Sequence, residues 1–137
     1  MKQVKNKSNE VLIKSEERKK KYGEVFTPSF LVNEMLNTLP NEIWGEKKTF
    51  LDPSCGNGNF LIEVLRRKIK AGQSELEALK QTYGVELLED NVEECKIRLL
   101  TETNMLSSEE AKKVIDRNII CADFLKLNLD EMWNDVI

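Results

Sequence analysis

The stretch that decides the fold is TFLDPSCGNGNF, residues 49–60. Its short apolar run stops at a proline, which predicts a buried strand over residues 49–52. Gly56 and Gly58 follow, and they let the backbone turn sharply and approach another group without a Cβ atom in the way. Apolar residues then recur at helical spacing over residues 59–72. The stretch therefore predicts a strand, a tight glycine loop and a helix, in that order.

Strand and helix patterns alternate on both sides of this stretch. Further strands are predicted over residues 83–87 and 118–122, and residues 134–137 have the pattern of the start of a fourth strand. Helices are predicted over residues 27–39, 74–81, 90–101 and 107–115. The expected N-caps are Thr27, Ser74 and Ser107. This order indicates an α/β fold with about half of a doubly wound parallel sheet and right-handed crossovers, truncated at the fourth strand.

The charge of the chain is unevenly distributed. The 137 residues carry a net charge of −3, but residues 1–22 hold eight basic and three acidic side chains and therefore carry +5. We expect a basic N-terminal arm or helix over residues 1–21, followed by the domain over residues 22–137. A charged helix over residues 9–21 is predicted, although its apolar residues are bunched rather than striped. The arm either touches phosphate groups or is a solvated terminus.

Composition and length exclude several classes of protein. A chain of 137 residues with 40% hydrophobic and 33% charged residues suits one soluble globular domain, not a collagen-like or disordered protein. No apolar run is long enough to span a bilayer and the N-terminus is too charged for a signal peptide, so we expect a cytoplasmic protein without a membrane partner. The absence of histidine and of any CxxC pair argues against His-based catalysis and against a metal site. Chemistry must then use carboxylates, amides, the backbone or a cofactor.

The glycine loop differs from the common phosphate-binding loops. A GxGxxG fingerprint needs a third glycine where the chain has Leu61, and a P-loop needs Lys-Ser/Thr after its last glycine. Asp52 opens the loop, and a carboxylate repels a pyrophosphate but attracts a positively charged group. The loop therefore predicts a ligand that is cationic at this point. The alternative is a tight turn that binds nothing.

Two further strand ends carry polar residues at the edge where an open parallel sheet binds its ligand. Glu86 ends the second strand, where a carboxylate accepts hydrogen bonds from both hydroxyls of a ribose. Asp123 and Phe124 end the third strand and offer an acceptor beside an aromatic face, which suits a flat heterocycle with an exocyclic amine. Alternatively, Glu86 caps the next helix, Asp123 is a surface residue and Phe124 belongs to the core. Together with the loop, these residues fit S-adenosylmethionine, with its cationic centres, ribose diol and adenine.

Two segments resemble known methyltransferase motifs. DPSCGNGNF (residues 52–60) resembles the first motif of amino-group methyltransferases, and YGEVFTP (residues 22–28) resembles the N-terminal cofactor motif of the DNA adenine-N6 methyltransferases of restriction-modification systems. GVELLEDNV, CADFLKL and NDVI resemble the next segments of that family, so the similarity covers residues 22–137. The resemblance implies a Rossmann-like fold that binds S-adenosylmethionine. The site residues that it implies are Thr27, Asp52, Ser54, Gly56 and Gly58 at the methionine end, Glu86 at the ribose, and Asp123 with Phe124 at the adenine.

The chain departs from the family at its end. The family's fourth strand leads to an Asn/Asp-Pro-Pro-Tyr/Phe motif, and no such sequence occurs in residues 1–137. In the family, this motif holds a flipped adenine and accepts hydrogen bonds from its N6 amine. We therefore expect the cofactor-binding portion of a DNA adenine-N6 methyltransferase, catalytically incomplete alone, because the catalytic motif would lie beyond Ile137.

The resemblance also implies partners for the complete enzyme. Double-stranded DNA is the expected substrate, and a restriction or specificity subunit is a further expected partner. An unfinished sheet edge at residues 134–137 would favour self-association. Two other interpretations stay open, namely a methyltransferase that acts on RNA or on a small molecule, and a non-catalytic module that binds the cofactor or a protein partner.

Overall fold

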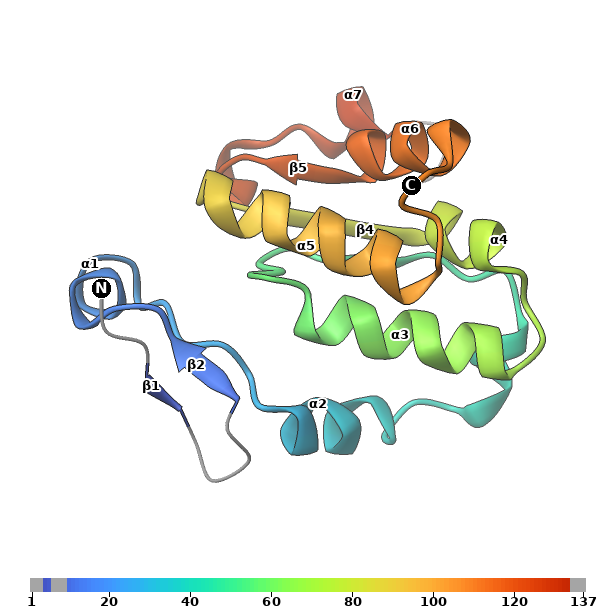
Figure 1. The fold of residues 1–137 in the computed structure, drawn as a ribbon, viewed down its shortest axis with the longest axis horizontal. Helices are drawn as coiled ribbons and strands as arrows, with labels where there is room; N and C mark the ends of the chain where they lie inside the picture. Colours follow the sequence, from blue (N-terminus) through green and yellow to red (C-terminus); the bar gives the residue numbers. More distant parts are fainter. Residues whose placement is uncertain (1–3, 6–9, 134–137) are drawn as a thin grey trace.

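A three-stranded parallel sheet forms the centre of the molecule. The computed structural model describes residues 4–5 and 10–133. β3 (Phe50–Asp52), β4 (Thr82–Glu86) and β5 (Ile119–Cys121) lie side by side in this order and run in one direction (Figure 1). Their carboxyl ends therefore meet at one edge of the sheet, which confirms the predicted α/β fold with a partial parallel sheet.

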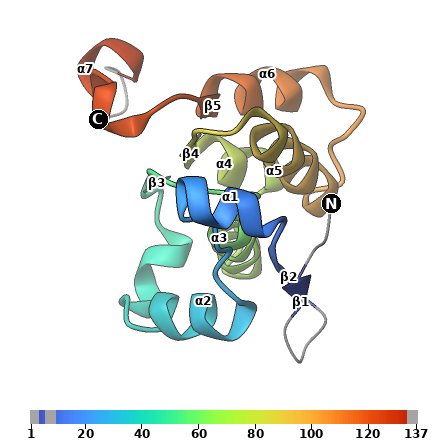
Figure 2. The ribbon, with the colours of Figure 1, turned by 90° about the vertical axis from the view of Figure 1, so that its left-hand side faces the viewer.

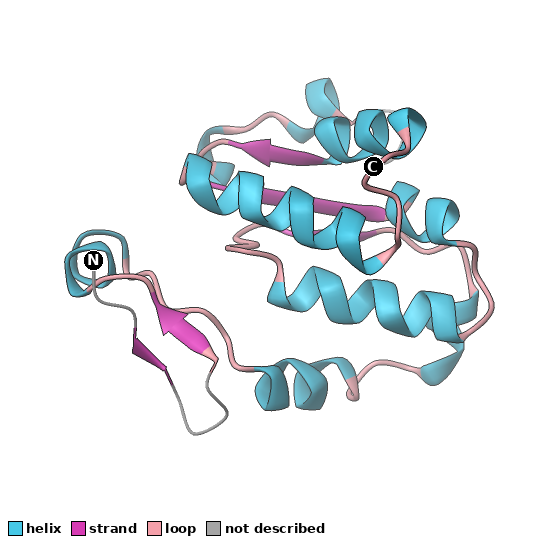
Figure 3. Cartoon of the chain, in the orientation of Figure 1, coloured by secondary structure: helices cyan, strands magenta, loops and turns pink. Residues whose placement is uncertain are grey.

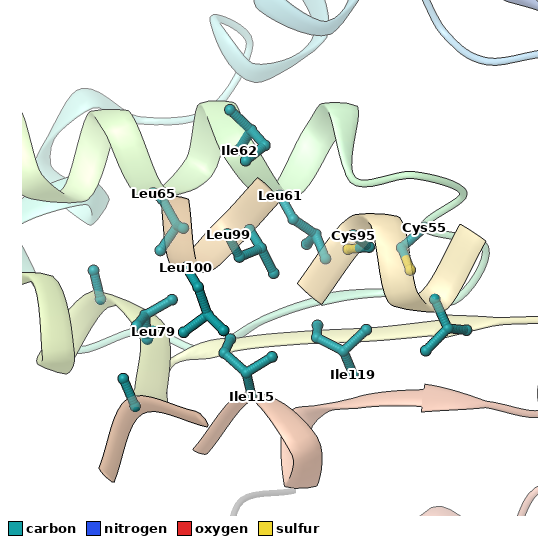
Figure 4. Close-up of a cluster of buried hydrophobic side chains, with 13 residues drawn as sticks. Cys55, Leu61, Ile62, Leu65, Leu79, Cys95, Leu99, Leu100, Ile115 and Ile119 are labelled. Carbon is teal, nitrogen blue, oxygen red and sulfur yellow. The ribbon is translucent and has the colours of Figure 1, made fainter. Parts of the chain in front are cut away.

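Helices connect the strands and bury one face of the sheet. α3 (Asn59–Lys70) and α4 (Glu75–Lys80) follow β3, and α5 (Glu89–Glu102) and α6 (Glu109–Asn118) follow β4. α3 and α5 lie on the same face of the sheet (Figures 1 and 3). Their apolar sides form the main core together with α6 and β5, as Figure 4 shows. Members without solvent exposure include Leu61, Leu65, Leu99, Ile115 and Ile119.

The opposite face of the sheet is covered by the last described segment. This segment contains the short helices η2 (Phe124–Lys126) and α7 (Leu129–Met132). Trp133 packs edge-on against Tyr83 of β4, with the ring centroids 5.1 Å apart. The indole N–H of Trp133 donates to the backbone oxygen of Arg117 at 3.2 Å, so the buried ring has no unpaired donor.

Gly84 allows the glycine loop and α3 to pack directly on β4. Side chains alternate between the two faces of a strand, so the position between Tyr83 and Val85 faces the helices. A Cβ atom at Gly84 would lie 2.9 Å from both Cys55 Sγ and Leu61 Cδ1. Any larger residue would therefore push the loop away from the sheet.

The N-terminal segment, whose described residues are 4–5 and 10–28, folds beside the carboxyl edge of the sheet. β1 (Val4–Lys5) pairs antiparallel with β2 (Val11–Ile13), and α1 (Glu16–Tyr22) follows. Figure 2, which views the molecule from that side, shows α1 in front of the sheet. α2 (Ser29–Leu36) and the 3-10 helix η1 (Asn41–Gly45) then pack on α3 and lead to β3. No helix within the described residues has the length and apolar character needed to cross a membrane.

The predicted helix over residues 9–21 is wrong in its first part. Residues 11–13 form β2, because three adjacent apolar side chains suit an extended pairing better than a helical stripe. The helix begins only after Ser15, whose side chain accepts a hydrogen bond from the Arg18 N–H at 3.1 Å. The fourth strand predicted over residues 134–137 lies outside the described residues.

The predicted N-caps are confirmed at one helix and shifted at two. Ser74 caps α4 through its side chain, as predicted. α2 has Pro28 at its N-cap and no side-chain cap from Thr27, because Pro28 already has the extended backbone of a cap residue. α6 is capped by Ser108 instead of Ser107, and the Ser108 hydroxyl accepts from the N–H three residues further on.

Candidate ligand-binding site

A cavity of about 570 Å³ lies at the carboxyl ends of the three parallel strands. Its volume falls in the range of about 300–1,000 Å³ that is typical of small-molecule sites. The strand ends and the glycine loop form one wall, and residues 22–27 of the N-terminal segment form another. Seven of the predicted site residues line it, namely Thr27, Asp52, Ser54, Gly56, Glu86, Asp123 and Phe124.

Asp52 stands at the start of the loop in a tight local turn. Its Oδ1 accepts a hydrogen bond from the Ser54 N–H at 3.0 Å. The Cys55 N–H donates to the Val85 oxygen at 2.9 Å, which fixes the loop against β4. Burial raises the pKa of Asp52 above its usual value, and the nearby Glu86 carboxylate raises it further, while the Ser54 N–H opposes both. The ionised Asp52 carboxylate is therefore destabilised until a positive charge comes near it.

Gly56 lies against an aromatic ring of the N-terminal segment. Its φ is +54°, a left-handed conformation that favours glycine. A Cβ atom at Gly56 would lie 3.1 Å from Phe26 Cδ1. Phe26 is itself fixed, because its N–H donates to the Leu12 oxygen at 2.6 Å. The loop and the N-terminal segment therefore touch where both border the cavity.

Gly58, the second glycine of the loop, differs from Gly56 in its surroundings. It is not among the residues that line the cavity, and it stands at the N-cap of α3 with a φ of +99°. A Cβ atom there would lie 2.9 Å from Cys95 Sγ of α5. Gly58 thus lets α3 and α5 approach each other, and its expected contact with a ligand stays a prediction.

Thr27 is held by a chain of hydrogen bonds that the sequence did not predict. The side chain of Asn59, the first residue of α3, donates to the Thr27 oxygen at 2.9 Å. Arg98 of α5 donates to Asn59 Oδ1 at 2.8 Å and to the Asn57 oxygen at 2.9 Å. The backbone at Thr27 is thereby tied to both helices that follow the glycine loop and β4.

Glu86 is buried at the end of β4, with 8% of its surface exposed. Its Oε2 accepts hydrogen bonds from the Leu88 N–H and from Asn91 Nδ2, both at 3.0 Å. The first of these bonds fixes the backbone of Leu88, the N-cap residue of α5, but α5 has no side-chain cap, so the alternative role of Glu86 as a helix cap is not realised. Oε1 receives no hydrogen bond from the residues that the structure describes, so one carboxylate oxygen stays available at the cavity.

Three functional candidates were missed by the sequence analysis, namely Arg18, Glu24 and Asn91. Asn91 Nδ2 donates to Glu24 as well as to Glu86, and Arg18 donates to Glu24 at 2.9 Å. Asn91 lies on the buried side of α5 beside Val92, and it has no solvent exposure. A polar residue in the apolar stripe of a helix requires a hydrogen-bond partner, and that was the available signal.

Basic residues of the N-terminal segment bind α5. Arg18 donates to both oxygens of Asp90, at 2.6 and 3.0 Å, and Lys14 Nζ lies 3.1 Å from Asp90 and 3.0 Å from Glu94. Arg18 and then Lys14 hold the pKa of Asp90 well below its usual range. The side chains of Lys14 and Arg18 are 13% and 17% exposed, so these two are not part of a solvated tail.

Asp123 and Phe124 have contacts that fit their alternative roles, and their predicted contact with adenine stays a prediction. Asp123 Oδ1 accepts from the Leu125 N–H at 3.1 Å and caps η2, as an ordinary surface residue would. Phe124 is partly buried against the cluster that contains Tyr83 and Trp133. Both residues nevertheless line the cavity. An acceptor and an aromatic group therefore remain at the end of β5.

The fold and the cavity together define a class of protein. A parallel sheet with a glycine loop after β3 and acidic residues at or just beyond its three strand ends is a partial Rossmann-like fold. The chain belongs to the N-6 DNA Methylase family, whose sequence model matches residues 8–129.

Two curated proteins are similar to parts of this chain. It is 32% identical over 124 residues to the type II methyltransferase M.VspI of Vibrio sp. strain 343. The aligned region covers 90% of this chain and 26% of that protein. It is 28% identical over 100 residues to the adenine-specific methyltransferase PglX of Streptomyces coelicolor, which covers 63% of this chain and 8% of that protein. The chain thus spans about a quarter of the first relative and less than a tenth of the second. No solved structure matches it.

Proposed function

We propose that this chain is the S-adenosylmethionine-binding part of a DNA adenine-N6 methyltransferase of a restriction-modification system. One observation carries the proposal: Asp52 and Glu86 border one cavity, and neither forms an ion pair with a residue that the structure describes. Carboxylates that are withdrawn from water without a cationic partner favour a ligand that brings positive charge. Membership of the N-6 DNA Methylase family supports a methyl donor as that ligand.

The methionine end of the cofactor is assigned to the glycine loop. Asp52 would attract the amino and sulfonium charges, because its own ionisation is disfavoured in their absence. Ser54, the Gly56 backbone and Thr27 would line the pocket around it. Gly56 suits this role, since a side chain at its position would meet the Phe26 ring.

The nucleoside end is assigned to the other two strands. Glu86 would accept the ribose hydroxyls with Oε1, the oxygen that Leu88 and Asn91 leave available. Asp123 would accept from the adenine amine with Oδ2, because Oδ1 already accepts from Leu125 and Oδ2 has only an ion pair with Lys126 Nζ at 4.0 Å, beyond hydrogen-bond distance. Phe124 would contact the adenine ring.

S-adenosylmethionine supplies an electrophilic methyl group on its sulfonium sulfur. The residues of this chain would bind and orient that group at the edge of the sheet, and in-line attack depends mainly on such positioning. The strand-end carboxylates are committed to the cofactor in this proposal. We therefore assign the acceptor for the adenine N6 amine to residues other than these 137, in a longer protein that flips the base of double-stranded DNA.

The complete enzyme in this proposal is longer than these 137 residues and has partners of its own. The relatives named as methyltransferases are several times longer than the aligned region, which supports a larger enzyme. We propose that it acts in the cytoplasm together with a restriction or specificity subunit. β3 and β5 each have a partner on one side only among the described strands, and self-association through an open sheet edge belongs to the same proposal.

Ligand titration tests the proposed function. S-adenosylmethionine, S-adenosylhomocysteine, NAD and ATP are titrated by calorimetry into residues 1–137. We expect one site that binds the first two ligands, and no binding of the two pyrophosphate-containing ligands, because Asp52 would repel them. Binding of NAD or ATP without S-adenosylmethionine, or no binding at all, would contradict the proposal.

A further inference from the structure

The side chain of Asn91 lies between two buried carboxylates. Its Nδ2 donates one hydrogen bond to Oε2 of Glu86 at 3.0 Å and another to Oε2 of Glu24. Asn91 has no solvent exposure, and its Oδ1 is buried without a hydrogen-bond partner in the described part of the chain. A buried amide oxygen without a partner lowers the stability of a fold. An apolar side chain would fill this position without an unpaired polar atom. The role of Asn91 is therefore to donate hydrogen bonds from Nδ2.

The bond from Asn91 occupies one oxygen of Glu86 and leaves the other without a hydrogen bond from the described residues. A carboxylate oxygen offers about two lone-pair sites. Those of Oε2 receive the Leu88 N–H and Asn91 Nδ2, both at 3.0 Å. Oε1 receives no hydrogen bond from any described residue, and Glu86 lines the cavity. One oxygen with two available sites matches the two neighbouring hydroxyls of a vicinal diol.

Arg18 binds Glu24, the second carboxylate to which Asn91 donates. It donates to Glu24 at 2.9 Å and to both oxygens of Asp90. Glu24 has a side chain that is only 9% exposed, and without Arg18 it would place a second negative charge beside Glu86. Like charges at this spacing repel. Arg18 therefore keeps Glu24 in the position from which it holds the Asn91 amide.

We propose that Asn91 is a positioning residue for Glu86, and that Arg18 and Glu24 of the N-terminal segment hold Asn91 in place. Together these residues present Oε1 of Glu86 to the ribose diol of the cofactor. The inference rests on the proposed binding of S-adenosylmethionine. It gives the N-terminal segment a part in the selection of a ligand that carries a diol.

A ligand without the diol separates positioning from general stability. We would measure the affinities of S-adenosylmethionine and of its 2′,3′-dideoxy analogue by calorimetry for the wild type and for Asn91→Leu, which keeps the branch at Cγ. We expect Asn91→Leu to weaken S-adenosylmethionine about tenfold and to change the affinity of the analogue by less than about twofold. The same loss for both ligands, or no loss for S-adenosylmethionine, would overturn the assignment.

A double substitution tests whether Asn91 acts through Glu86. Asn91→Leu combined with Glu86→Ala should bind S-adenosylmethionine no more weakly than Glu86→Ala alone, because residues that act through one contact are not additive. A further loss in the double variant would show that Asn91 acts elsewhere.

Arg18→Leu tests the same hydrogen bonds from the N-terminal segment and leaves the Asn91 side chain itself unchanged. We expect a loss of about threefold for S-adenosylmethionine, none for the analogue, and partial recovery in Arg18→Lys. Arg66→Leu is the control, since Arg66 also pairs with carboxylates, Glu63 and Glu102, but these do not line the cavity, whereas the Arg18 partner Glu24 does. An equal loss in Arg66→Leu, or no diol-dependent loss in Arg18→Leu, would contradict the role of the N-terminal segment.

The outcomes distinguish this inference from the function on which it rests. If Glu86→Ala leaves the affinity for S-adenosylmethionine unchanged, the proposed function fails. If Glu86→Ala weakens binding and Asn91→Leu does not, the proposed function stands and the positioning role fails.

Discussion

The ring of Phe26 lies directly against the backbone of Gly56, where a Cβ atom would be 3.1 Å from Phe26 Cδ1. Phe26 belongs to the N-terminal segment and is 5% exposed, whereas Gly56 belongs to the loop after β3. Both residues line the cavity. The N-terminal segment is therefore part of the candidate site.

Gly56→Ala should weaken both the fold and the site. A left-handed φ costs an L-residue about 1–2 kcal/mol, and the loss of unfolded-state freedom returns about 0.4–1 kcal/mol. We expect the free energy of unfolding to fall by about 1 kcal/mol, with weaker binding of S-adenosylmethionine. Gly45→Ala is the control, because φ is not positive there and the nearest atom to a Cβ is 3.9 Å away. Denaturant unfolding that gives the same result for both variants would contradict this account.

Asp52→Asn should stabilise the fold while it weakens the site. Because the pKa of Asp52 is raised in the folded protein, its ionised form opposes folding, and stability falls as pH rises from the unfolded value near ~3.9 through the raised folded value. Asparagine keeps the acceptor for the Ser54 N–H and removes the charge. We expect a higher melting temperature at neutral pH without ligand, and weaker binding of S-adenosylmethionine. A lower melting temperature with unchanged affinity would contradict both expectations.

The raised pKa of Asp52 also predicts how the affinity for the ligand depends on pH. The cationic ligand requires ionised Asp52, so the affinity of the wild type should fall as pH falls through the raised pKa of Asp52. Asp52→Asn should lose this dependence. Calorimetric titrations of both proteins over the acidic range check it, and a parallel decline in both would show that another group is responsible.

Asp90 should titrate below its usual range and respond to Arg18. Its folded pKa is depressed, so the stabilisation from this ion pair is present above the unfolded value near ~3.9 and is lost as pH falls through the depressed folded value. In Arg18→Leu, the pKa of Asp90 should rise toward its usual value. Carboxyl-carbon NMR titration measures this, with Arg66→Leu as the control that should leave Asp90 unchanged. The stability effect should be small, since the Asp90 side chain is 52% exposed.

Local patterns were sufficient to predict the sheet and the loop. The apolar runs that became β3 and β4 each end at an acidic residue, and a glycine loop joins β3 to the helix that follows it. The residues at these strand ends meet at the cavity because parallel strands share one edge. Chain pattern alone therefore placed Asp52 and Glu86 correctly relative to each other.

Local patterns could not predict contacts between segments that are distant in the sequence. Glu24 and Asn91 are 67 positions apart, and nothing in either segment specifies the other. β2 was predicted as part of a helix because its partner strand, Val4–Lys5, is short and charged at one position. The Glu24–Asn91 contact depends on tertiary packing and β2 on its pairing with β1, and the propensity of a single segment encodes neither.

Residues 1–137 should bind the cofactor without transferring its methyl group to DNA. The lone pair of an adenine amine is delocalised into the ring, so attack requires a positioned acceptor and a pocket for the flipped base. Asp52, Glu86 and Asp123 are assigned to the cofactor and cannot serve as that acceptor. Tritiated-methyl transfer to mixed-sequence duplex DNA and to RNA should stay at background. Incorporation into either would show that the catalytic group lies within these residues.

Titration of S-adenosylmethionine into the wild type, Glu86→Ala and Glu89→Ala tests the central claim most directly. Hydrogen bonds to a charged acceptor contribute roughly 1.5–3 kcal/mol each, so the loss of those from a ribose diol should weaken binding about tenfold or more in Glu86→Ala. Glu89→Ala removes an exposed carboxylate in the first turn of α5 and should bind as the wild type does. Equal affinities for the wild type and Glu86→Ala would contradict the assignment of the cavity to S-adenosylmethionine.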